Sequence, residues 1–307
     1  MKVVLLAGGL GTRLREETEF RPKPMVEVGG KPILWHLMKI FASHGLTDFV
    51  VCAGYKGEHI KQYFLNYAAH NNDFTVTLGR PGEITFHDAH LESDWTVTVA
   101  DTGPSTLTAG RVERIERYVA GERFIVTYGD GLADIDVTSL VDFHAGHGRE
   151  ATLTTVRPTS RFGLVDADDQ GLVTRFREKP QSDGWVNAGF FVFEPSVFDH
   201  LRNSDDVMLE NEPLTALAAN GQLASYRHDG FWQPMDTSRE HVLLNELWKS
   251  GSAPWAVWNR RSGAATRPAG SPAPGSLRGL PVQRGGGAEE PATGGVADAA
   301  PWRPTGS

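Results

Sequence analysis

An apolar run that stops at a cluster of glycines is the feature that most constrains how this 307-residue chain can fold. Residues 2–7 are almost continuously apolar, and Gly8, Gly9 and Gly11 follow directly. A strand without polar alternation is typical of a sheet buried on both faces, and such sheets are mostly parallel and covered by helices. The opening of the chain therefore predicts an α/β fold.

Later segments repeat the alternation of strand and helix. Pro32 is predicted to open a helix, because its missing N–H costs nothing there, and Gly45 to close it. Further strands are predicted at residues 47–53, 124–128, 151–157, 173–177 and 190–193, and further helices at 58–69, 137–147, 209–219 and 238–249. This order favours a mixed, mostly parallel sheet with helices on both faces, and segments 74–100 and 163–177 are predicted to add shorter antiparallel strands to it.

The composition changes sharply near residue 259. The 49 residues from there to the end contain 10 Gly and 7 Pro and show no apolar period. Such a segment cannot bury enough apolar surface to offset the entropy of ordering it. We predict a folded domain at 1–258 and a disordered tail at 259–307, which is either a partner-binding arm or an unselected extension.

Charge and cysteine content exclude several classes of protein. The formal net charge is −8, so the chain has no general field that attracts a polyanion, and nucleic acid is not expected as a partner. The single cysteine, Cys52, lies in an apolar run and is predicted to be a small buried hydrophobe, which suits a reducing compartment. No apolar stretch approaches the ~20 residues that span a bilayer. A cytoplasmic protein without a membrane contact is expected.

Two basic segments near the N-terminus point to phosphate. In an open α/β sheet, ligands bind beyond the carboxyl ends of the strands, and glycine N–H groups there can face phosphate oxygens. Arg13 adds a permanently charged donor fork, and Lys23 stands between Pro22 and Pro24, which restrict the backbone around it. The glycine spacing matches neither the dinucleotide fingerprint nor the P-loop. Taken singly, a plain glycine turn and a surface lysine remain the alternatives.

Two isolated aspartates are candidate metal ligands. Asp130 follows the predicted strand 124–128 between glycines, and Asp236 lies in an aromatic, proline-restricted segment. A turn residue and a cap for helix 238–249 are the respective alternatives. Mg²⁺ commonly takes one or two protein carboxylates together with substrate phosphates. The histidine pairs 87/90 and 144/147 lack a further ligand at a recognised spacing and are interpreted as solvated.

Together, the Gly-Gly-x-Gly-Thr-Arg-Leu and Lys-Pro segments resemble the signature of the sugar-1-phosphate nucleotidyltransferases. The resemblance implies a Rossmann-like three-layer fold, a glycine loop and arginine that hold a nucleoside triphosphate, and a lysine on its phosphates. Residues carried over to the nucleotide site are Leu6, Ala7, Gly8, Gly9, Gly11, Thr12, Arg13, Lys23 and Gly129. Asp130 and Asp236 take the metal-binding role, with Mg²⁺ as the ion.

A second part of the resemblance concerns the other substrate. Glu178-Lys179-Pro180, beside Phe162-Gly163 and the segment 185–189, is similar to the sugar-phosphate subsite of these enzymes. The resemblance places Lys179 on the phosphate and assigns Gly163, Glu178 and Asn187 to the sugar. Arg13, Lys23 and Lys179 are then the cationic groups expected to catalyse the transfer.

The choice of nucleotide rests on the resemblance alone. Residues 101–103, 127–131, 230–237 and 253–255, with Thr106 and Arg111, look like the glucose-1-phosphate cytidylyltransferases, in which the latter two belong to the nucleotide site. CTP and glucose 1-phosphate are the expected substrates, and CDP-glucose for deoxysugar synthesis is the expected product. The resemblance also implies a homo-oligomer, often a hexamer in this family. The alternatives are a transferase for UTP, dTTP or GTP, a catalytically dead nucleotide-sugar-binding subunit, and a glycosyltransferase, for which only Asp134-Ile135-Asp136 approaches the metal motif.

Overall fold

The computed structural model describes residues 1–79, 83–87, 90–119, 121–160 and 162–261. The chain forms a compact unit over Met1–Ala264. A short helix, α10 (Trp258–Arg261), extends just past the predicted domain end at residue 258. Most of the predicted tail, from residue 262 on, lies outside the described residues, so both the boundary and the disorder of the tail stay predictions.

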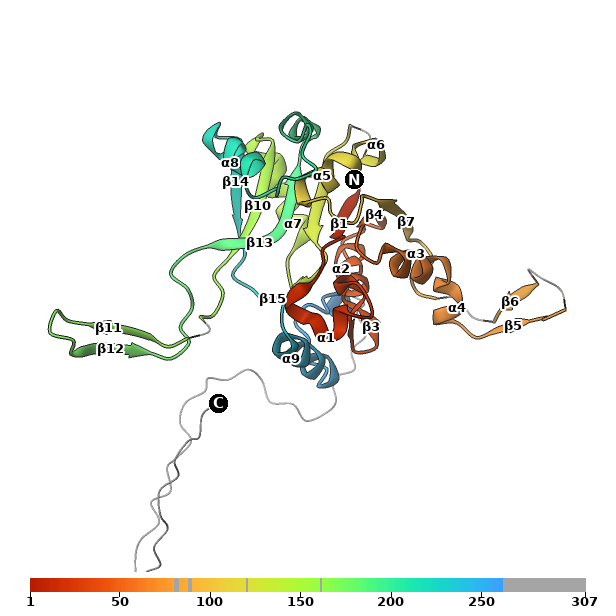
Figure 1. The fold of residues 1–307 in the computed structure, drawn as a ribbon, viewed down its shortest axis with the longest axis horizontal. Helices are drawn as coiled ribbons and strands as arrows, with labels where there is room; N and C mark the ends of the chain where they lie inside the picture. Colours follow the sequence, from red (N-terminus) through yellow and green to blue (C-terminus); the bar gives the residue numbers. More distant parts are fainter. Residues whose placement is uncertain (80–82, 88–89, 120, 161, 262–307) are drawn as a thin grey trace, which may run out of the picture. The chain divides into compact units, whose positions relative to one another are not determined.

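A seven-stranded sheet forms the centre of this unit (Figure 1). Its order is β14 (Leu223–Arg227), β10 (Ala151–Val156), β13 (Val186–Phe193), β8 (Phe124–Tyr128), β1 (Val3–Ala7), β4 (Asp48–Ala53) and β7 (Thr96–Asp101). Neighbouring strands run parallel except at β13, which is antiparallel to both β8 and β10. The predicted mixed, mostly parallel sheet is confirmed.

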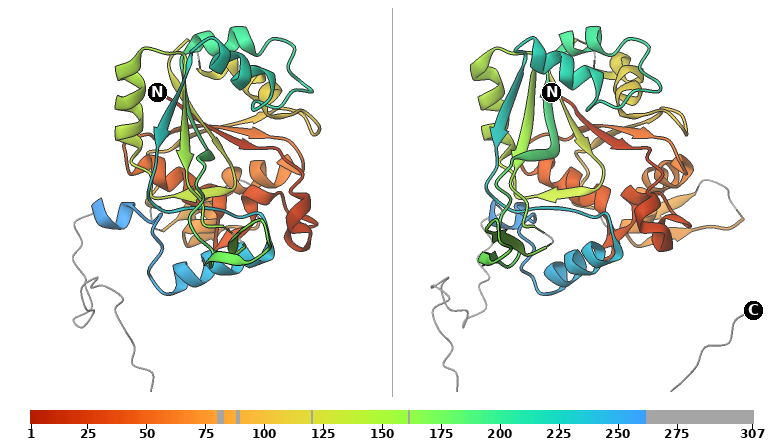
Figure 2. Two further views of the ribbon diagram at one scale, coloured as in Figure 1. Left: turned by 90° about the vertical axis from the view of Figure 1, so that its left-hand side faces the viewer. Right: turned by 60° about the vertical axis from the view of Figure 1, so that its left-hand side comes forward.

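Helices cover both faces of the sheet, which explains why β1 has no polar alternation (Figure 2). Val3, Leu5 and Ala7 point into one apolar core, and Val4 and Leu6 into the other. The first core also takes side chains from α2 (Ile33–Ala42), α3 (Gly57–Leu65), α7 (Val137–His147) and α9 (Ser238–Lys249), and the second from α5 (Thr108–Arg114), α6 (Glu116–Val119) and α8 (Glu212–Ala219). The three-layer architecture is therefore confirmed.

Some predicted elements differ from the observed ones. Among the described strands of segment 74–100, β7 alone joins the main sheet, and it runs parallel to β4. The short strands β5 (Phe74–Val76) and β6 (Ile84–Phe86) pair with each other, as do β11 (Leu164–Ala167) and β12 (Val173–Arg177). The prediction that both segments add antiparallel strands to the main sheet is wrong, because each hairpin satisfies its ladder locally. The predicted helix 58–69 is interrupted at Asn66, between α3 and α4 (Tyr67–Asn71).

Three predicted surroundings can be checked directly. Cys52 is fully buried, and this burial raises the pKa of its thiol to about 12, as suits an inert core residue. His144 is buried and hydrogen-bonded to Thr152 at 2.8 Å, so the interpretation of this histidine as solvated is wrong. No helix in the described ranges is both long and apolar enough to cross a membrane.

A buried histidine in α2, His36, connects this helix to Trp255 near the end of the described chain. His36 is completely buried; its Nε2 donates to the carbonyl of Val28 at 2.8 Å, and its Nδ1 accepts from the indole N–H of Trp255 at 3.3 Å. Both ring nitrogens are thus satisfied by a neutral imidazole. Burial lowers the pKa of His36 to about 4.

This histidine should make folding stability depend on pH. An unfolded histidine takes up a proton near pH 6.5, whereas His36 in the folded chain has a pKa of about 4, so the unfolded state binds more protons between these values. The neutral histidine contributes fully to stability above pH 6.5. As the pH falls to 4, the free energy of unfolding should decrease by about 3 kcal/mol. Urea unfolding of His36→Gln should show a flatter pH dependence than the wild type, and His59→Gln, at a surface histidine, an unchanged one. Equal slopes for His36→Gln and the wild type would contradict the assignment.

Candidate active site

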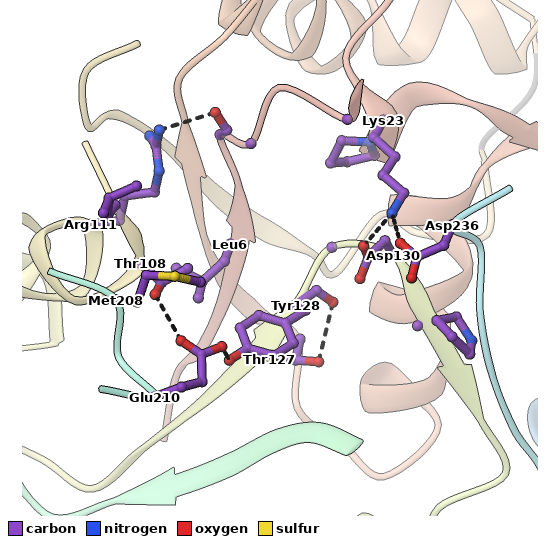
Figure 3. A pocket seen from close by; sticks show the side chains of 18 of the residues that line it. Leu6, Lys23, Thr108, Arg111, Thr127, Tyr128, Asp130, Met208, Glu210 and Asp236 are labelled. Carbon is purple, nitrogen blue, oxygen red and sulfur yellow. Dashed lines mark hydrogen bonds and ion pairs between the residues drawn. The ribbon is translucent and has the colours of Figure 1, made fainter. Parts of the chain in front are cut away.

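A cavity of about 580 Å³ opens beyond the carboxyl ends of β1 and β8 (Figure 3). Many of the residues predicted for a substrate site line it: Leu6, Gly8, Gly9, Gly11, Thr12, Arg13, Lys23, Thr106, Arg111, Gly129, Asp130, Asn187 and Asp236. Ala7 is fully buried in β1 and does not line the cavity. Gly163, Glu178 and Lys179 are absent from the lining formed by the described residues.

The glycine loop connects β1 to a short helical turn. Gly11 has a positive φ of 64°, which favours glycine, and its carbonyl accepts the N–H of Leu14 as the turn Thr12–Leu14 begins. Gly129 follows β8 and donates its N–H to the carbonyl of Leu6 at 3.0 Å, and a Cβ there would lie 2.8 Å from that oxygen. Glycine is therefore required where the two strand ends meet.

Arg111 supports the glycine loop from behind. Only 4% of this residue is exposed, and its guanidinium donates to the carbonyl of Gly8 at 3.0 Å, to that of Gly103 at 2.8 Å and to the hydroxyl of Thr102 at 2.7 Å. Burial lowers the pKa of Arg111. The guanidinium thus ties the glycine loop to the segment before α5, and in this structure its donors are directed to the protein rather than fully to the cavity. Its predicted role on phosphate stays a prediction.

This packing predicts a steric effect at Gly8. A Cβ on Gly8 would lie 2.1 Å from the Arg111 guanidinium, whereas a Cβ on Gly9 would meet nothing within 4 Å. Gly8→Ala should lower the free energy of unfolding by about 1–3 kcal/mol, as overpacking does, because Arg111 has to leave its carbonyl partners. Gly9→Ala is the matched control, and thermal unfolding compares the two. Equal stability of the two variants would refute this role of Arg111.

Lys23 lies between the two predicted metal ligands. The short helix Lys23–Met25 begins after Pro22, and the ammonium contacts Asp130 Oδ2 and Asp236 Oδ1, each at 2.6 Å. Burial alone would lower the pKa of Lys23, but the two carboxylates outweigh this effect and the pKa is raised. Figure 3 shows the three side chains converging at one end of the cavity. Arg13 reaches the same group, 3.3 Å from Asp236 Oδ2, with most of its side chain exposed.

A small two-stranded sheet brings the two aspartates together. The strand β9 (Gly131–Ala133) follows Asp130, and β15 (Trp232–Pro234) precedes Asp236. They pair antiparallel, with Gly131 opposite Pro234, and Met235 donates its N–H to the carbonyl of Asp130 at 2.8 Å. The carboxylates thus lie at the same end of one ladder.

Helix α9 is capped by Thr237 and not by Asp236, the cap considered from the sequence. Thr237 is the N-cap residue and forms a capping box with Glu240, whose carboxylate accepts the N–H groups of Thr237 at 3.0 Å and Asp236 at 2.7 Å. The side chain of Asp236 is directed to Lys23 and Arg13 instead. The cap is therefore provided by the neighbouring residue.

The donor set of the aspartates fits a hard divalent cation. Two carboxylate oxygens that both lie 2.6 Å from one ammonium converge on a single point. Among the described residues, no group of three or more His, Cys, Asp and Glu is arranged to hold a metal. Two carboxylates completed by substrate phosphates and water are a common environment of Mg²⁺.

The residues predicted for the sugar phosphate lie in two places. Asn187 lines the cavity from β13, and its side-chain oxygen accepts the N–H of Gly189 at 2.7 Å. Lys179 and Glu178 follow β12 in the β11–β12 hairpin; their side chains are exposed and lie 3.5 Å from each other. This hairpin extends from the sheet in Figure 1, so within one chain the predicted trio of Arg13, Lys23 and Lys179 does not face a common cavity.

Sequence reasoning missed part of the cavity wall. The missed lining residues include Leu107, Thr108, Tyr128, Met208, Glu210 and Trp232. Tyr128 directly precedes Gly129 and ends β8, so its position beside the site was available from the pattern. No spacing indicates Glu210, because its partner Thr108 is 102 residues away.

Comparison with known proteins identifies the family. The sequence matches the family described as "Nucleotidyl transferase" over residues 2–237. The chain belongs to the nucleotidyl transferase family. It is 52% identical over 260 residues to the glucose-1-phosphate cytidylyltransferase of Salmonella typhi, covering 84% of this chain and 100% of that protein. It is 31% identical over 263 residues to the mannose-1-phosphate guanyltransferase of Neurospora crassa, covering 82% of this chain and 66% of that protein.

Solved structures of the same fold are more distant in sequence. HddC from Yersinia pseudotuberculosis superposes with a TM-score of 0.60 at 21% identity, covering 80% of this chain and 99% of that chain. A UDP-glucose pyrophosphorylase complexed with UDP-glucose gives 0.58 at 14% identity, covering 81% and 98%. This nucleotidyl transferase therefore has the Rossmann-like fold of these structures.

Proposed function

We propose that this nucleotidyl transferase transfers CMP from CTP to α-D-glucose 1-phosphate, giving CDP-glucose and pyrophosphate. The observation that supports this most directly is the 52% identity to the cytidylyltransferase of Salmonella typhi along the whole length of that protein. The cavity supplies groups suited to the reaction. A glycine loop, Arg13 and Lys23 lie beside two convergent carboxylates, which suits a polyphosphate and a cation.

The reaction is an in-line displacement at phosphorus. An oxygen of the sugar phosphate forms a bond to the α-phosphorus of CTP, and the bond from that phosphorus to the pyrophosphate oxygen breaks. The attacking phosphate is already anionic, so no general base is needed. The site has to offset repulsion between two anions and stabilise charge on the equatorial and leaving oxygens. Arg13 and Lys23 are the cationic side chains placed for this at the aspartate end of the cavity.

Asp130 and Asp236 would hold Mg²⁺, which when bound neutralises phosphate charge and orients the triphosphate. Lys23 contacts both of these carboxylates in the structure, so binding of a cation has to release its ammonium. The released ammonium can then donate to a phosphate oxygen. Without a bound cation, the charges of Lys23 and Arg13 together balance those of the two carboxylates.

Nucleotide choice is tested by measuring pyrophosphate release with CTP, UTP, dTTP and GTP, each with glucose 1-phosphate. We expect CTP to give the highest kcat/KM. A higher value with another nucleotide would refute the base assignment while keeping the reaction class. Nucleotide binding without turnover with any of the four would favour a dead binding subunit.

We also propose that the protein acts in the cytoplasm as a homo-oligomer, such as a hexamer. Both projecting hairpins expose apolar side chains, among them Phe74 and Ile84 in β5–β6 and Val173 and Phe176 in β11–β12. Exposed apolar groups on hairpins favour contact with another chain. Light scattering of the purified protein measures the assembly, and a monomer at micromolar concentration would overturn this proposal.

A further inference from the structure

A chain of polar side chains crosses the cavity away from the aspartates. Glu210 lies between Thr108 and Tyr128, and Figure 3 shows all three on the side opposite Lys23. One carboxylate oxygen of Glu210 accepts the hydroxyl of Thr108 at 3.3 Å, and the other accepts the hydroxyl of Tyr128. The N–H of Leu209 donates to the same threonine hydroxyl at 2.7 Å. Glu210 is thus held in place by α5 on one side and by the end of β8 on the other.

The chemistry of this wall differs from that of the aspartate end. A carboxylate offers only acceptors, and its charge repels phosphate. The phenol of Tyr128 donates its hydroxyl hydrogen to this carboxylate, so the tyrosine also orients the acceptor that faces the cavity. This end of the cavity therefore suits an uncharged group that donates hydrogen bonds, such as a sugar hydroxyl.

Other residues that line the cavity beside this wall indicate which part of the substrates it faces. Tyr128 directly precedes Gly129 and Asp130 in the chain, and all three residues line the cavity. Asn187 from β13 lines the same cavity. The wall therefore borders the place where the sugar of a sugar phosphate has to fit.

We propose that the carboxylate of Glu210 accepts a hydrogen bond from a hydroxyl group of the sugar 1-phosphate and so determines which sugar is used. Tyr128 orients this carboxylate. This inference rests on the proposed function. A ribose hydroxyl of the nucleotide is the other source of the same chemistry, because α5 also carries Arg111, and the experiment separates the two.

The test couples substitutions in the protein to deletions in the substrate. Steady-state kinetics of the wild type, Glu210→Ala and Glu210→Gln are measured with glucose 1-phosphate and its 2-, 3-, 4- and 6-deoxy analogues. Glu210→Ala should raise the KM for glucose 1-phosphate by about 10–100-fold, the range for a lost charge-assisted hydrogen bond, and change the KM for CTP less than threefold. Glu210→Gln keeps an acceptor and should recover part of the loss. Asp206→Asn, an exposed acid in the same segment and outside the cavity lining, is the matched control and should behave as the wild type.

The decisive result is non-additivity with one analogue. The analogue that lacks the hydroxyl bound by Glu210 should be poor with the wild type and no poorer with Glu210→Ala. Independent losses with all four analogues, or non-additivity with 2′- or 3′-deoxy-CTP instead, would overturn the inference.

Two further measurements keep the outcome interpretable. Thermal unfolding of each variant identifies a folding defect. If Glu210→Ala is unstable, the kinetic constants of the isosteric Glu210→Gln are compared with those of the wild type instead. A wild type that does not use glucose 1-phosphate overturns the proposed function and this inference with it, whereas a competent wild type without coupling overturns only the inference.

Discussion

Asp236→Ala is expected to lower kcat/KM by about 10³-fold, on the order of 4 kcal/mol, comparable to the loss of a strong transition-state contact. The carboxylate lies 2.6 Å from Lys23 and shares that lysine with Asp130, so its removal leaves one carboxylate to hold a cation. The apparent affinity for Mg²⁺, measured as the concentration that gives half-maximal rate, should weaken as well. Asp229→Asn, an exposed acid close by in sequence, is the control.

Two outcomes would count against this role of Asp236. A variant within threefold of the wild type in kcat/KM would remove the residue from the site. A loss of activity with an unchanged Mg²⁺ dependence would assign it to positioning Lys23 and Arg13 rather than to the metal. Circular dichroism verifies that helix α9, which begins two residues later, is still formed.

Arg13→Ala and Lys179→Ala are each expected to lower kcat/KM by about 10²–10³-fold, which corresponds to about 2.7–4 kcal/mol, the loss typical of a missing donor in the transition state. Arg13 lines the cavity of its own chain, so Arg13→Ala should impair the active site of each chain that carries it. Lys179 lies on the β11–β12 hairpin, so it can act on phosphate only if the hairpin changes position or reaches the cavity of a second copy.

Mixing the two variants distinguishes these routes for Lys179. If the lysine serves the cavity of a second copy, co-expressed Arg13→Ala and Lys179→Ala chains form some sites with both wild-type residues, and part of the activity returns. If the hairpin folds back onto its own chain, no mixed site is complete and activity stays low. A Lys179→Ala variant within threefold of the wild type would exclude Lys179 from the reaction altogether.

Several parts of the fold follow from local sequence alone. The strand Phe124–Tyr128 and the helices Val137–His147 and Ser238–Lys249 have the bounds that the pattern predicts. Apolar period, proline and glycine signals act within a few residues of each other, so they can be interpreted without knowing the rest of the chain. The same holds for the glycine loop after β1, because the carboxyl end of a buried strand is where a parallel sheet presents ligands.

The carboxylate pair marks the limit of such reasoning. The sequence pattern makes Asp130 and Asp236 candidate metal ligands, and the resemblance gives them that role. The residue that lies between them is Lys23, 213 positions before Asp236. The alternative of Asp236 as a helix cap was open in the sequence, and the capping box of Thr237 and Glu240 shows which neighbour takes that role. Local rules do not choose between two adjacent residues that are both good caps.

What the sequence by itself determined is the α/β architecture, the glycine loop at the end of β1 and the kinds of residue that a phosphate and metal site needs. The tertiary structure alone decided that Arg111 turns toward backbone carbonyls, that Lys179 stands on a separate hairpin and that Glu210 closes the cavity with Tyr128. Secondary structure depends on neighbours a few positions apart, whereas hydrogen bonds across 82 or 103 residues depend on how layers and strand ends pack in three dimensions.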